Sequence, residues 1–396
     1  AVTDNGNELY AKLNHADGMP LIGVSDPIAV NNPFDVLVPF VMRHQQARVR
    51  YQFISYTEPM ESLTLNWLNS DQTYNAGDVY LNLKGEKLRN GNNQAGIFYS
   101  GALHLNQAYQ PSSIVKEYSY TTDYILCSPD FTTPSYYAIT AMLYGRSIGS
   151  NKPVWLGALQ KNHSYIWKLK LKNKDPWYLY NDGTIGSLAK RGSRTPIGVV
   201  VKEKASESAQ GTAIALKDVS SGTTFTYTTP YNWAKMNTQH NTTHYTDAND
   251  GINDMDGYKW TYEAAGSVDG RIKANFEADY TPFYKAAQYN PGVAVTGSNV
   301  GKWYVPALGE WALAWKVFGK WDGNIPSWGM LTMSVSAMNS AFTAAGGDNL
   351  YNYDYWTCTE YEGPMRPALN VGGAGFYIGL NATHNLTGHV RPFVHF

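Results

Sequence analysis

The residues best suited to bind a metal ion lie in one acidic stretch. Residues 247–257 read Asp-Ala-Asn-Asp-Gly-Ile-Asn-Asp-Met-Asp-Gly. Calcium takes about six to eight oxygen ligands, and a glycine-punctuated Asp/Asn loop can turn several oxygens toward one point. The stretch departs from an EF-hand loop, because Gly251, Ile252 and Tyr258 fall where acidic or glycine residues are needed. Two interpretations stay open, an Asx-rich turn or a calcium site with the ligands Asp247, Asn249, Asp250, Asp254 and Asp256.

A second pair of candidate metal ligands is formed by His240 and His244. On a helix this spacing would let both histidines share one metal ion. The residues between them, Asn241–Thr243, are poor helix formers, and no Glu follows His240 as in zinc proteases. The pattern therefore favours a surface loop. The later histidines have no Cys or carboxylate at ligand spacing and are predicted to be structural or exposed: His384, His389 and His395.

Two glutamates are the candidates for acid–base chemistry. Glu310 and Glu360 could serve a glycosidase if the fold placed them roughly 5 to 9 Å apart in a cleft. Their surroundings favour structural roles, in which Glu310 orients the start of a helix while Glu360 or Arg391 satisfies a buried partner. Cys358 lies in an aromatic, β-prone segment and is predicted to be a buried strand residue. We therefore predict that the protein is not an enzyme.

Aromatic side chains are the remaining candidates for ligand binding. Several lie in Gly/Asn/Asp-rich segments on either side of a predicted helix at 331–345. Tyr and Trp offer a large contact area at small rotamer cost, so they suit stacking against sugar rings or peptide side chains. They could equally fill the core of a helix-poor domain. The candidates are Trp321, Trp328, Tyr351, Tyr353 and Tyr355.

The composition favours β-structure and does not point to a charged partner. The chain has 396 residues, of which 30 are Tyr, 12 Trp and 13 Phe, and only 16% are charged, a mixture typical of half-buried sheet surfaces. Thirty-one basic residues nearly balance 32 acidic ones, so charge implies neither nucleic acid nor an anionic membrane. Cys127 and Cys358 are far apart, and no disulfide is predicted. No apolar run reaches the roughly 20 residues that span a bilayer.

Alternating apolar and polar residues predict strands along the first 175 or so residues. In the segment Ala47–Ile54, Val49, Tyr51 and Phe53 alternate with polar residues, as in a strand with one buried face. Strands at this spacing suggest a β-sandwich. The other predicted strands are Leu63–Trp67, Val79–Leu83, Gly96–Leu105, Tyr118–Cys127, Tyr136–Leu143, Val154–Leu156 and Tyr165–Leu171.

This part of the chain resembles a known family. The segment Phe40-Val41-Met42-Arg43-His44-Gln45-Gln46-Ala47-Arg48-Val49, followed by Leu63-Thr64-Leu65-Asn66 and the strand near 157–171, is similar to the fimbrillin-like proteins of Bacteroidales pili. The resemblance implies two tandem transthyretin-like β-sandwich domains and export as a lipoprotein to the outer surface. It also implies polymerisation with other pilin subunits by exchange of a β-strand.

From about residue 173 the sequence changes character. Apolar strands are predicted at Pro196–Val201 and Gly211–Val219, and helices at Pro282–Gln288, Ala307–Phe318 and Leu331–Ala345. The order of its motifs resembles a module of Bacteroidetes and Fibrobacter surface proteins that is similar to C-type-lectin-like folds. In such folds the terminal strands pair and long loops bind ligands. The residues that mark the module are Trp303, Pro306, Glu310, Trp356, Glu360 and Arg391.

These observations predict a mainly β protein with an α+β C-terminal domain. The expected domains are an N-terminal fimbrillin-like β-sandwich at 1–118, a smaller one at 119–178 and a C-type-lectin-like recognition domain at 179–396. The predicted function is a non-catalytic pilus tip subunit or adhesin at the cell surface or outer membrane, which binds a glycan or protein ligand through its C-terminal loops. An embedded strand at Val390–Phe396 would suit the tip position. The alternatives are a surface glycan hydrolase and a minor structural pilin without a ligand.

Overall fold

The computed structural model divides the chain into two compact units. Unit 1 holds Ala1–Tyr109 and Glu117–Asn173, and unit 2 holds Gln110–Lys116 and Lys174–Phe396. The predicted boundary at 118/119 would fall inside one strand of unit 1, so a division of this part into two domains stays a prediction. The structure describes residues 2–4, 8–11, 21–23, 37, 39–44, 47–56, 62–67, 73–74, 79–82, 87–90, 94–95, 97–102, 104–105, 110–121, 124–127, 137–143, 146–150, 160, 162–171, 176–232, 240–319, 323, 330–331, 335–361, 368–372, 375–379 and 387–396.

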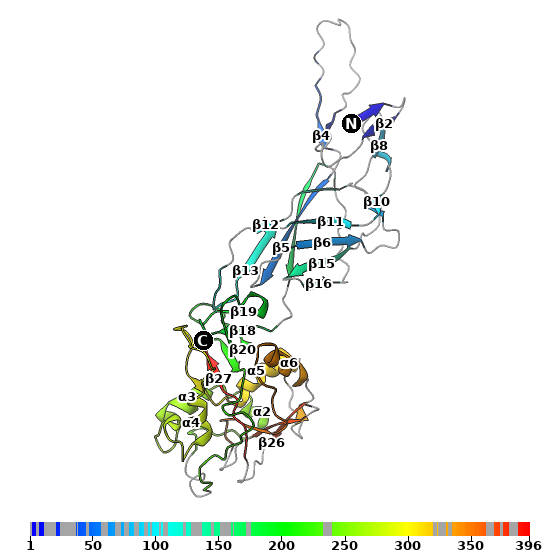
Figure 1. Cartoon of the computed structure of the whole chain (residues 1–396). Helices are drawn as coiled ribbons and strands as arrows, with labels where there is room; N and C mark the ends of the chain where they lie inside the picture. Colours follow the sequence, from blue (N-terminus) through cyan, green and yellow to red (C-terminus); the bar gives the residue numbers. More distant parts are fainter. Residues whose placement is uncertain are drawn as a thin grey trace. The chain divides into compact units, whose positions relative to one another are not determined.

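The described elements of unit 1 are strands (Figure 1). They form sheets in the orders β1-β2-β8-β9, β11-β6-β15-β16 and β12-β13-β5-β14, with β17 also paired to β5, and the pairs β10-β7 and β3-β4. The strands are β1 (Val2–Asp4), β2 (Glu8–Ala11), β3 (Leu21–Ile22), β4 (Arg43–His44), β5 (Ala47–Tyr56), β6 (Ser62–Trp67), β7 (Thr73–Tyr74), β8 (Val79–Asn82), β9 (Lys87–Asn90), β10 (Gln94–Ala95), β11 (Ile97–Ala102), β12 (His104–Leu105), β13 (Glu117–Thr121), β14 (Ile125–Cys127), β15 (Tyr137–Leu143), β16 (Arg146–Ser150) and β17 (Ser164–Leu171).

Strand β5, which the alternating sequence predicts as a strand, is the centre of its sheet. It pairs antiparallel with β13, where Phe53 lies opposite Tyr120, and parallel with β17, where Ser164 lies opposite Arg48. Phe53 and Tyr120 are buried, whereas Gln52 is only half-buried. The period-two pattern thus places one face of this strand in the core. The predicted strand at Val154–Leu156 lies outside the described residues.

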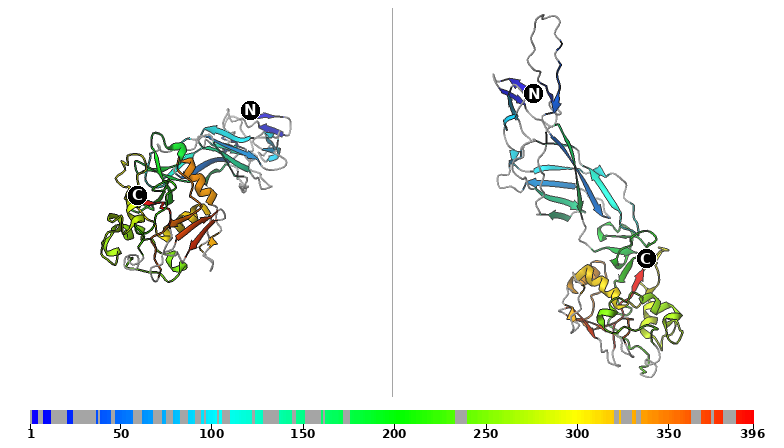
Figure 2. Two further views of the ribbon diagram at one scale, coloured as in Figure 1. Left: turned by 60° about the horizontal axis from the view of Figure 1, so that its bottom comes forward. Right: turned by 180° about the vertical axis from the view of Figure 1, so that it is seen from behind.

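Unit 2 is built on a six-stranded sheet in the order β19-β18-β20-β21-β27-β22. Its last strand, shown in red, lies beside the green strands of the same sheet (Figure 2). This strand pairs with β21 and β22 and not with β18, the first strand of the unit. The strands are β18 (Tyr178–Tyr180), β19 (Ile185–Gly186), β20 (Pro196–Lys202), β21 (Thr212–Ala215), β22 (Trp303–Tyr304) and β27 (Phe393–His395).

Both faces of this sheet are buried, which explains the continuous apolar run of β20. Val199 and Val201 face one core cluster, and Val200 faces another. A strand covered on two sides needs apolar residues at successive positions. The strands predicted at 196–201 and 211–219 are thus both present. The second, β21, ends earlier than predicted, at Ala215. It ends there because the next carbonyl, that of Leu216, accepts a hydrogen bond from Arg391 at 2.6 Å.

A second sheet and several helices complete unit 2. The sheet has the order β23-β26-β25-β24, with β23 (Met330–Leu331), β24 (Asp354–Trp356), β25 (Ala368–Gly372) and β26 (Gly375–Gly379). The helices are α2 (Ala248–Gly251), α3 (Gly257–Tyr262), α4 (Thr281–Ala287), α5 (Leu308–Gly319) and α6 (Val335–Ala344), with short 3-10 turns η2 (Leu188–Lys190), η3 (Ala264–Gly266) and η4 (Lys273–Asn275). In the part of the chain that the structure describes, no helix has both the length and the apolar character needed to cross a membrane.

Two of the three predicted helices match closely, and the third is shorter. Helices α4 and α5 begin and end within one residue of their predicted bounds. Helix α6 begins at Val335 and not at Leu331, because Leu331 belongs to β23 and pairs with Phe376. Helix α3 was not predicted, since its start at Gly257 follows an Asp-rich stretch that is typical of a turn. The described chain is therefore β-rich, with its helices in unit 2.

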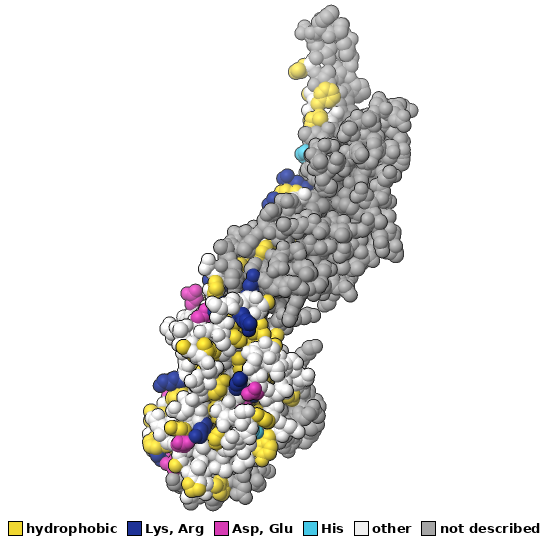
Figure 3. All heavy atoms as spheres, in the orientation of Figure 1, with side chains coloured by type: hydrophobic (Ala, Val, Ile, Leu, Met, Phe, Trp, Pro, Cys, Tyr) yellow, Lys and Arg dark blue, Asp and Glu magenta, His cyan; other side chains and the backbone are white. Residues whose placement is uncertain are grey.

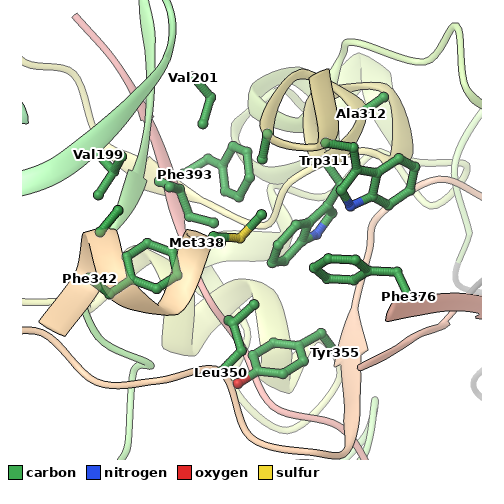
Figure 4. Close-up of a cluster of buried hydrophobic side chains, with 14 of the residues drawn as sticks. Val199, Val201, Trp311, Ala312, Met338, Phe342, Leu350, Tyr355, Phe376 and Phe393 are labelled. Atoms are coloured by element: carbon green, nitrogen blue, oxygen red, sulfur yellow. The ribbon is translucent and has the colours of Figure 1, made fainter. Parts of the chain in front are cut away.

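Helices α5 and α6 pack on the six-stranded sheet through a core centred on Trp311 (Figure 4). The Trp311 ring lies 5.2 Å from that of Phe393 and 6.1 Å from that of Phe376, measured between centroids. The neighbouring Gly309 has no room for a side chain, because a Cβ there would lie 2.4 Å from the carbonyl oxygen of Asp254. Gly309 therefore lets α5 lie close to the backbone of Asp254, while Trp311 fills the core on the other side of the helix.

Candidate functional site

Glu310 is a structural carboxylate at the start of α5. Its side chain is fully buried, and its Oε2 accepts a hydrogen bond from the backbone N–H of Ala307 at 2.8 Å. Its Oε1 accepts one from the hydroxyl of Tyr304 at 2.6 Å and lies 3.3 Å from Nε2 of His395. Burial raises the pKa of the carboxyl above its usual 4.5. The side chain thus joins β22, α5 and the C-terminal strand, in the helix-orienting role that its position predicts.

The other module markers belong to the same buried framework. Trp303 and Pro306 are buried, and the Pro306 carbonyl accepts a hydrogen bond from the N–H of Cys358 at 3.0 Å. Trp356 is buried and donates its indole N–H to the Phe225 carbonyl at 2.8 Å. Cys358 is fully buried, and burial raises the pKa of its thiol. These residues hold unit 2 together and present no reactive group to solvent.

Arg391 and Asp218 form a buried ion pair behind this framework. The Nε of Arg391 donates to Oδ1 of Asp218 at 2.5 Å, and the Tyr355 hydroxyl donates to Oδ2 at 3.0 Å. Both charged side chains are almost completely buried. Nδ1 of His389 lies 3.7 Å from the same carboxylate, and burial lowers the pKa of this imidazole. Arg391 therefore satisfies a buried partner, and that partner is Asp218.

The acidic stretch does not gather around one point. Asp254 is buried and accepts hydrogen bonds from the indole N–H of Trp260 at 3.0 Å and the hydroxyl of Thr359 at 2.8 Å. Asp247 accepts the backbone N–H of Asp250 at 2.8 Å, as an N-cap residue of helix α2 does, and both side chains are exposed. The remaining two predicted calcium ligands, Asn249 and Asp256, are also exposed. Asp254 is turned into the core, and its Oδ1 accepts the backbone N–H of Asp256, two residues on, at 3.0 Å, so the geometry fits the Asx-turn interpretation.

The aromatic candidates separate into surface and core residues. Tyr353 is 45% exposed, and Tyr351 is half-buried and stacks on His389 with 4.5 Å between ring centroids. Tyr355 is fully buried and lies against Trp311, so its ring has no face for a ligand. Trp321 and Trp328 lie outside the described residues, as does His384. The described surface candidates are therefore Tyr351 and Tyr353.

The structure also brings a third side chain, that of Glu360, to the histidine pair His240 and His244. His240 and His244 lie in a loop, as expected, with 5.0 Å between their ring centroids. Glu360, which comes more than 100 residues later, contributes a carboxylate whose Oε2 is 3.5 Å from Nε2 of His244. Glu360 is buried and accepts the backbone N–H of Asn241 at 2.6 Å. The i, i+4 histidine spacing was the only sequence signal for this cluster.

The sequence also holds a Gly-x-Ser-x-Gly string at 145–149, which is the pattern of a hydrolase nucleophile elbow. Ser147 lies within β16, opposite Met142 of β15. A hydrolase nucleophile needs a sharp turn between a strand and a helix. The serine is instead part of a hairpin strand.

Among the known proteins, the chain has a distant structural likeness to a fimbrial protein. No known protein family and no curated protein matches the chain. Among solved structures, the chain is similar to a fimbrial protein from Bacteroides ovatus ATCC 8483, with 14% sequence identity and a TM-score of 0.37 over 91% of this chain and 72% of that one. The neighbour is of the fimbrial class that the sequence resemblance names. At this TM-score the likeness is remote, and it does not bear on the predicted lectin-like module.

Proposed function

We propose that this protein is a non-catalytic subunit of a cell-surface pilus that assembles with other copies of itself through unit 1. The observation that carries the proposal is a run of exposed apolar residues in the chain that leads into β4. Leu37 is 91% exposed, Phe40 58%, Val41 67% and Met42 52%. Figure 3 shows such apolar side chains at the surface beside this strand. Contiguous exposed apolar residues mark interaction sites in soluble proteins.

Strand exchange is the mode of assembly that fits this segment. Residues 39–42 form neither helix nor strand, and they continue directly into β4, which is already paired with β3. A second copy could pair with this backbone and cover Phe40 and Val41 with its own apolar side chains, as in β-strand addition. The sequence resemblance to fimbrillin-like proteins implies the same mode. Export as a lipoprotein and a position at the outer membrane or pilus tip follow from that resemblance as further parts of the proposal.

Introduction of negative charges into the apolar run should prevent this assembly. For the double variant Phe40→Asp/Val41→Asp, we expect the weight-average mass of the protein at high concentration to fall to that of a monomer, because buried carboxylates would be unpaired in the contact. Sedimentation velocity over a concentration series measures this. Val317→Asp introduces the same charge at an apolar residue of unit 2 that is 49% exposed, and it should assemble like the wild type. A wild-type protein that stays monomeric at every concentration would refute the proposal.

For unit 2 we propose a ligand surface around Tyr351 and Tyr353. The Tyr351 hydroxyl lies 3.0 Å from that of Ser221, and the Tyr353 hydroxyl lies 3.3 Å from that of Thr387. On the face drawn in Figure 3, the charged side chains of unit 2 are scattered. The partners of both tyrosine hydroxyls are uncharged, so a neutral glycan or peptide suits the surface around them better than a polyion. A hydrolase has less support, because Glu310 and Glu360 are buried with separate partners.

Removal of one exposed ring should weaken ligand binding without unfolding the protein. We expect Tyr353→Ala to lower the affinity for a glycan that the wild type binds by about 5- to 30-fold, which corresponds to the loss of one stacking contact of roughly 1–2 kcal/mol. Glycan-array screening followed by calorimetric titration measures this. The matched control is Tyr231→Ala, because Tyr231 is also exposed in unit 2. If no glycan or peptide binds the wild type, the protein is a structural pilin without a ligand.

A further inference from the structure

We propose that His240, His244 and Glu360 form a binding site for a divalent transition-metal ion, with zinc as the best fit. Each residue offers one ligand atom, and the three atoms lie within 4.8 Å of one another. In a tetrahedral zinc site with bonds of about 2.0–2.2 Å, neighbouring ligand atoms are roughly 3.3–3.5 Å apart. The distance of 3.5 Å between Nε2 of His244 and Oε2 of Glu360 already matches this value. A small rotation of the His240 ring would complete the set.

One ring nitrogen of each histidine can serve as a metal ligand. Nε2 of His244 is buried and has no hydrogen-bond partner among the residues that the structure describes. A buried nitrogen in this state has lost its contact with water without gaining a protein partner, and a metal ion would satisfy it. Nδ1 of His240 lies 3.2 Å from the carbonyl oxygen of Asn241. Metal-binding histidines usually donate one ring N–H to a carbonyl in this way, which leaves the other nitrogen for the metal.

The carboxylate is held in place by a second layer of polar contacts. Glu360 is buried, and its Oε2 accepts the backbone N–H of Asn241 at 2.6 Å. The side-chain amide of Asn241 donates to the Cys358 carbonyl at 2.7 Å and accepts from the ammonium group of Lys273. Carboxylate ligands in metal sites are commonly fixed by such hydrogen bonds. Two neutral imidazoles and one carboxylate form a mixed N/O set that suits zinc better than calcium, which prefers oxygen ligands alone.

Backbone contacts fix the loop on both sides of the site. The N–H of Val268 donates to the His240 carbonyl at 2.9 Å, and the N–H of Thr242 donates to the Gly266 carbonyl at 3.1 Å. On the other side, the N–H of Tyr245 donates to the Glu360 carbonyl at 2.9 Å. Because the ligands are held by backbone pairing, little ordering entropy is lost when the ion binds. A bound metal would join the 240–245 loop to residues 360–361.

The proposal is tested by titration of the full chain, without a polyhistidine tag and after treatment with a chelator, with zinc chloride in a calorimeter. The expected result is one zinc ion per chain. The single variants His240→Ala and His244→Ala should each weaken binding by about 10-fold or more, and the double variant should abolish it. His163→Ala removes an exposed histidine of unit 1 and should bind like the wild type. If His240→Ala, His244→Ala and His163→Ala all lost the same amount of zinc affinity, binding would be general to surface histidines and the proposal would be overturned.

Thermal unfolding in the presence of zinc tests binding independently of the heat of binding that the calorimeter measures. Zinc should raise the midpoint of the wild type and of His163→Ala, but not that of the double variant, because only a protein that binds the ion gains stability from it. Glu360→Gln retains an acceptor for the Asn241 N–H and removes the charge, so it should fold and bind zinc more weakly. If His244→Ala does not fold, His240→Ala decides the question, since its ring is partly exposed. Wild-type affinity in the folded variants, or no stoichiometric binding to the wild type, would refute the site.

Discussion

The variant Arg391→Ala is expected to lose about 3–5 kcal/mol of unfolding free energy, because it leaves the buried carboxylate of Asp218 without its cation. The guanidinium also donates to the carbonyls of Leu216 at 2.6 Å and Ala215 at 3.3 Å, and its other nitrogen donates to those of Asp348 at 3.2 Å and Asn349 at 3.3 Å. Its central carbon lies 4.8 Å from the Phe342 ring centroid. One side chain therefore satisfies acceptors from two separate segments of unit 2, residues 215–218 and 348–349.

The size of this loss should depend on pH in a defined direction. Burial raises the pKa of Asp218 above 3.8, while the charge of Arg391 and the hydroxyl of Tyr355 oppose that shift. A carboxyl whose pKa is raised by folding contributes stability below its unfolded pKa and loses it as pH rises through the folded pKa. Without Arg391 the folded pKa of Asp218 rises further. The loss of stability in Arg391→Ala should therefore be smaller at about pH 5 than at about pH 8.

Urea unfolding at the two pH values, combined with hydrogen exchange of the β21 amides, measures this effect in unit 2. The control is Lys217→Ala, because Lys217 is exposed next to Asp218, and it should change stability by less than about 0.5 kcal/mol. Adding Asp218→Asn to Arg391→Ala should recover part of the loss, since no buried charge is then unpaired. An Arg391→Ala protein as stable as Lys217→Ala would contradict the role assigned to the ion pair.

The local sequence pattern was sufficient to predict strands in which buried residues recur at a regular spacing. The alternation of β5 indicates a strand with one buried face, and the continuous apolar run of β20 indicates a strand with two. Both strands are present. The start of α6 could not be placed, because Leu331 pairs with Phe376, and that partner is 45 positions away. Pairing across such a distance leaves no trace in local periodicity.

The candidate sites depended even more on distant contacts. Asp254 has the sequence features of a metal ligand, but Thr359, from a distant segment, binds its carboxylate inside the core. Conversely, nothing near Glu360 in the sequence points to His240 and His244, because only the folded chain brings the three together. Tyr353 and Tyr355 look alike in the sequence, and the hydroxyl of Tyr355 is buried by its bond to Asp218. Residue type was thus informative, whereas burial had to come from the structure.

Replacement of Trp311 with alanine should destabilise unit 2 by about 3–5 kcal/mol, the range found when a large buried aromatic residue is truncated. The side chain is fully buried, and its ring lies against Phe393, Phe376 and Tyr355. A cavity at this point would lie where α5 meets both sheets (Figure 4). Because alanine has a higher helix propensity than tryptophan, α5 itself is not weakened, and the loss would report packing alone.

Two further variants separate packing from other causes. Trp311→Phe keeps an aromatic ring and removes an indole N–H that has no hydrogen-bond partner in the described part of the chain, so it should lose less than half as much stability as Trp311→Ala. Val317→Ala lies on the same helix at a residue that is 49% exposed, and its effect should stay within about 0.5 kcal/mol. Urea unfolding ranks the three. If Trp311→Ala and Val317→Ala were equally stable, the core at α5 would not be the main contributor that its burial implies.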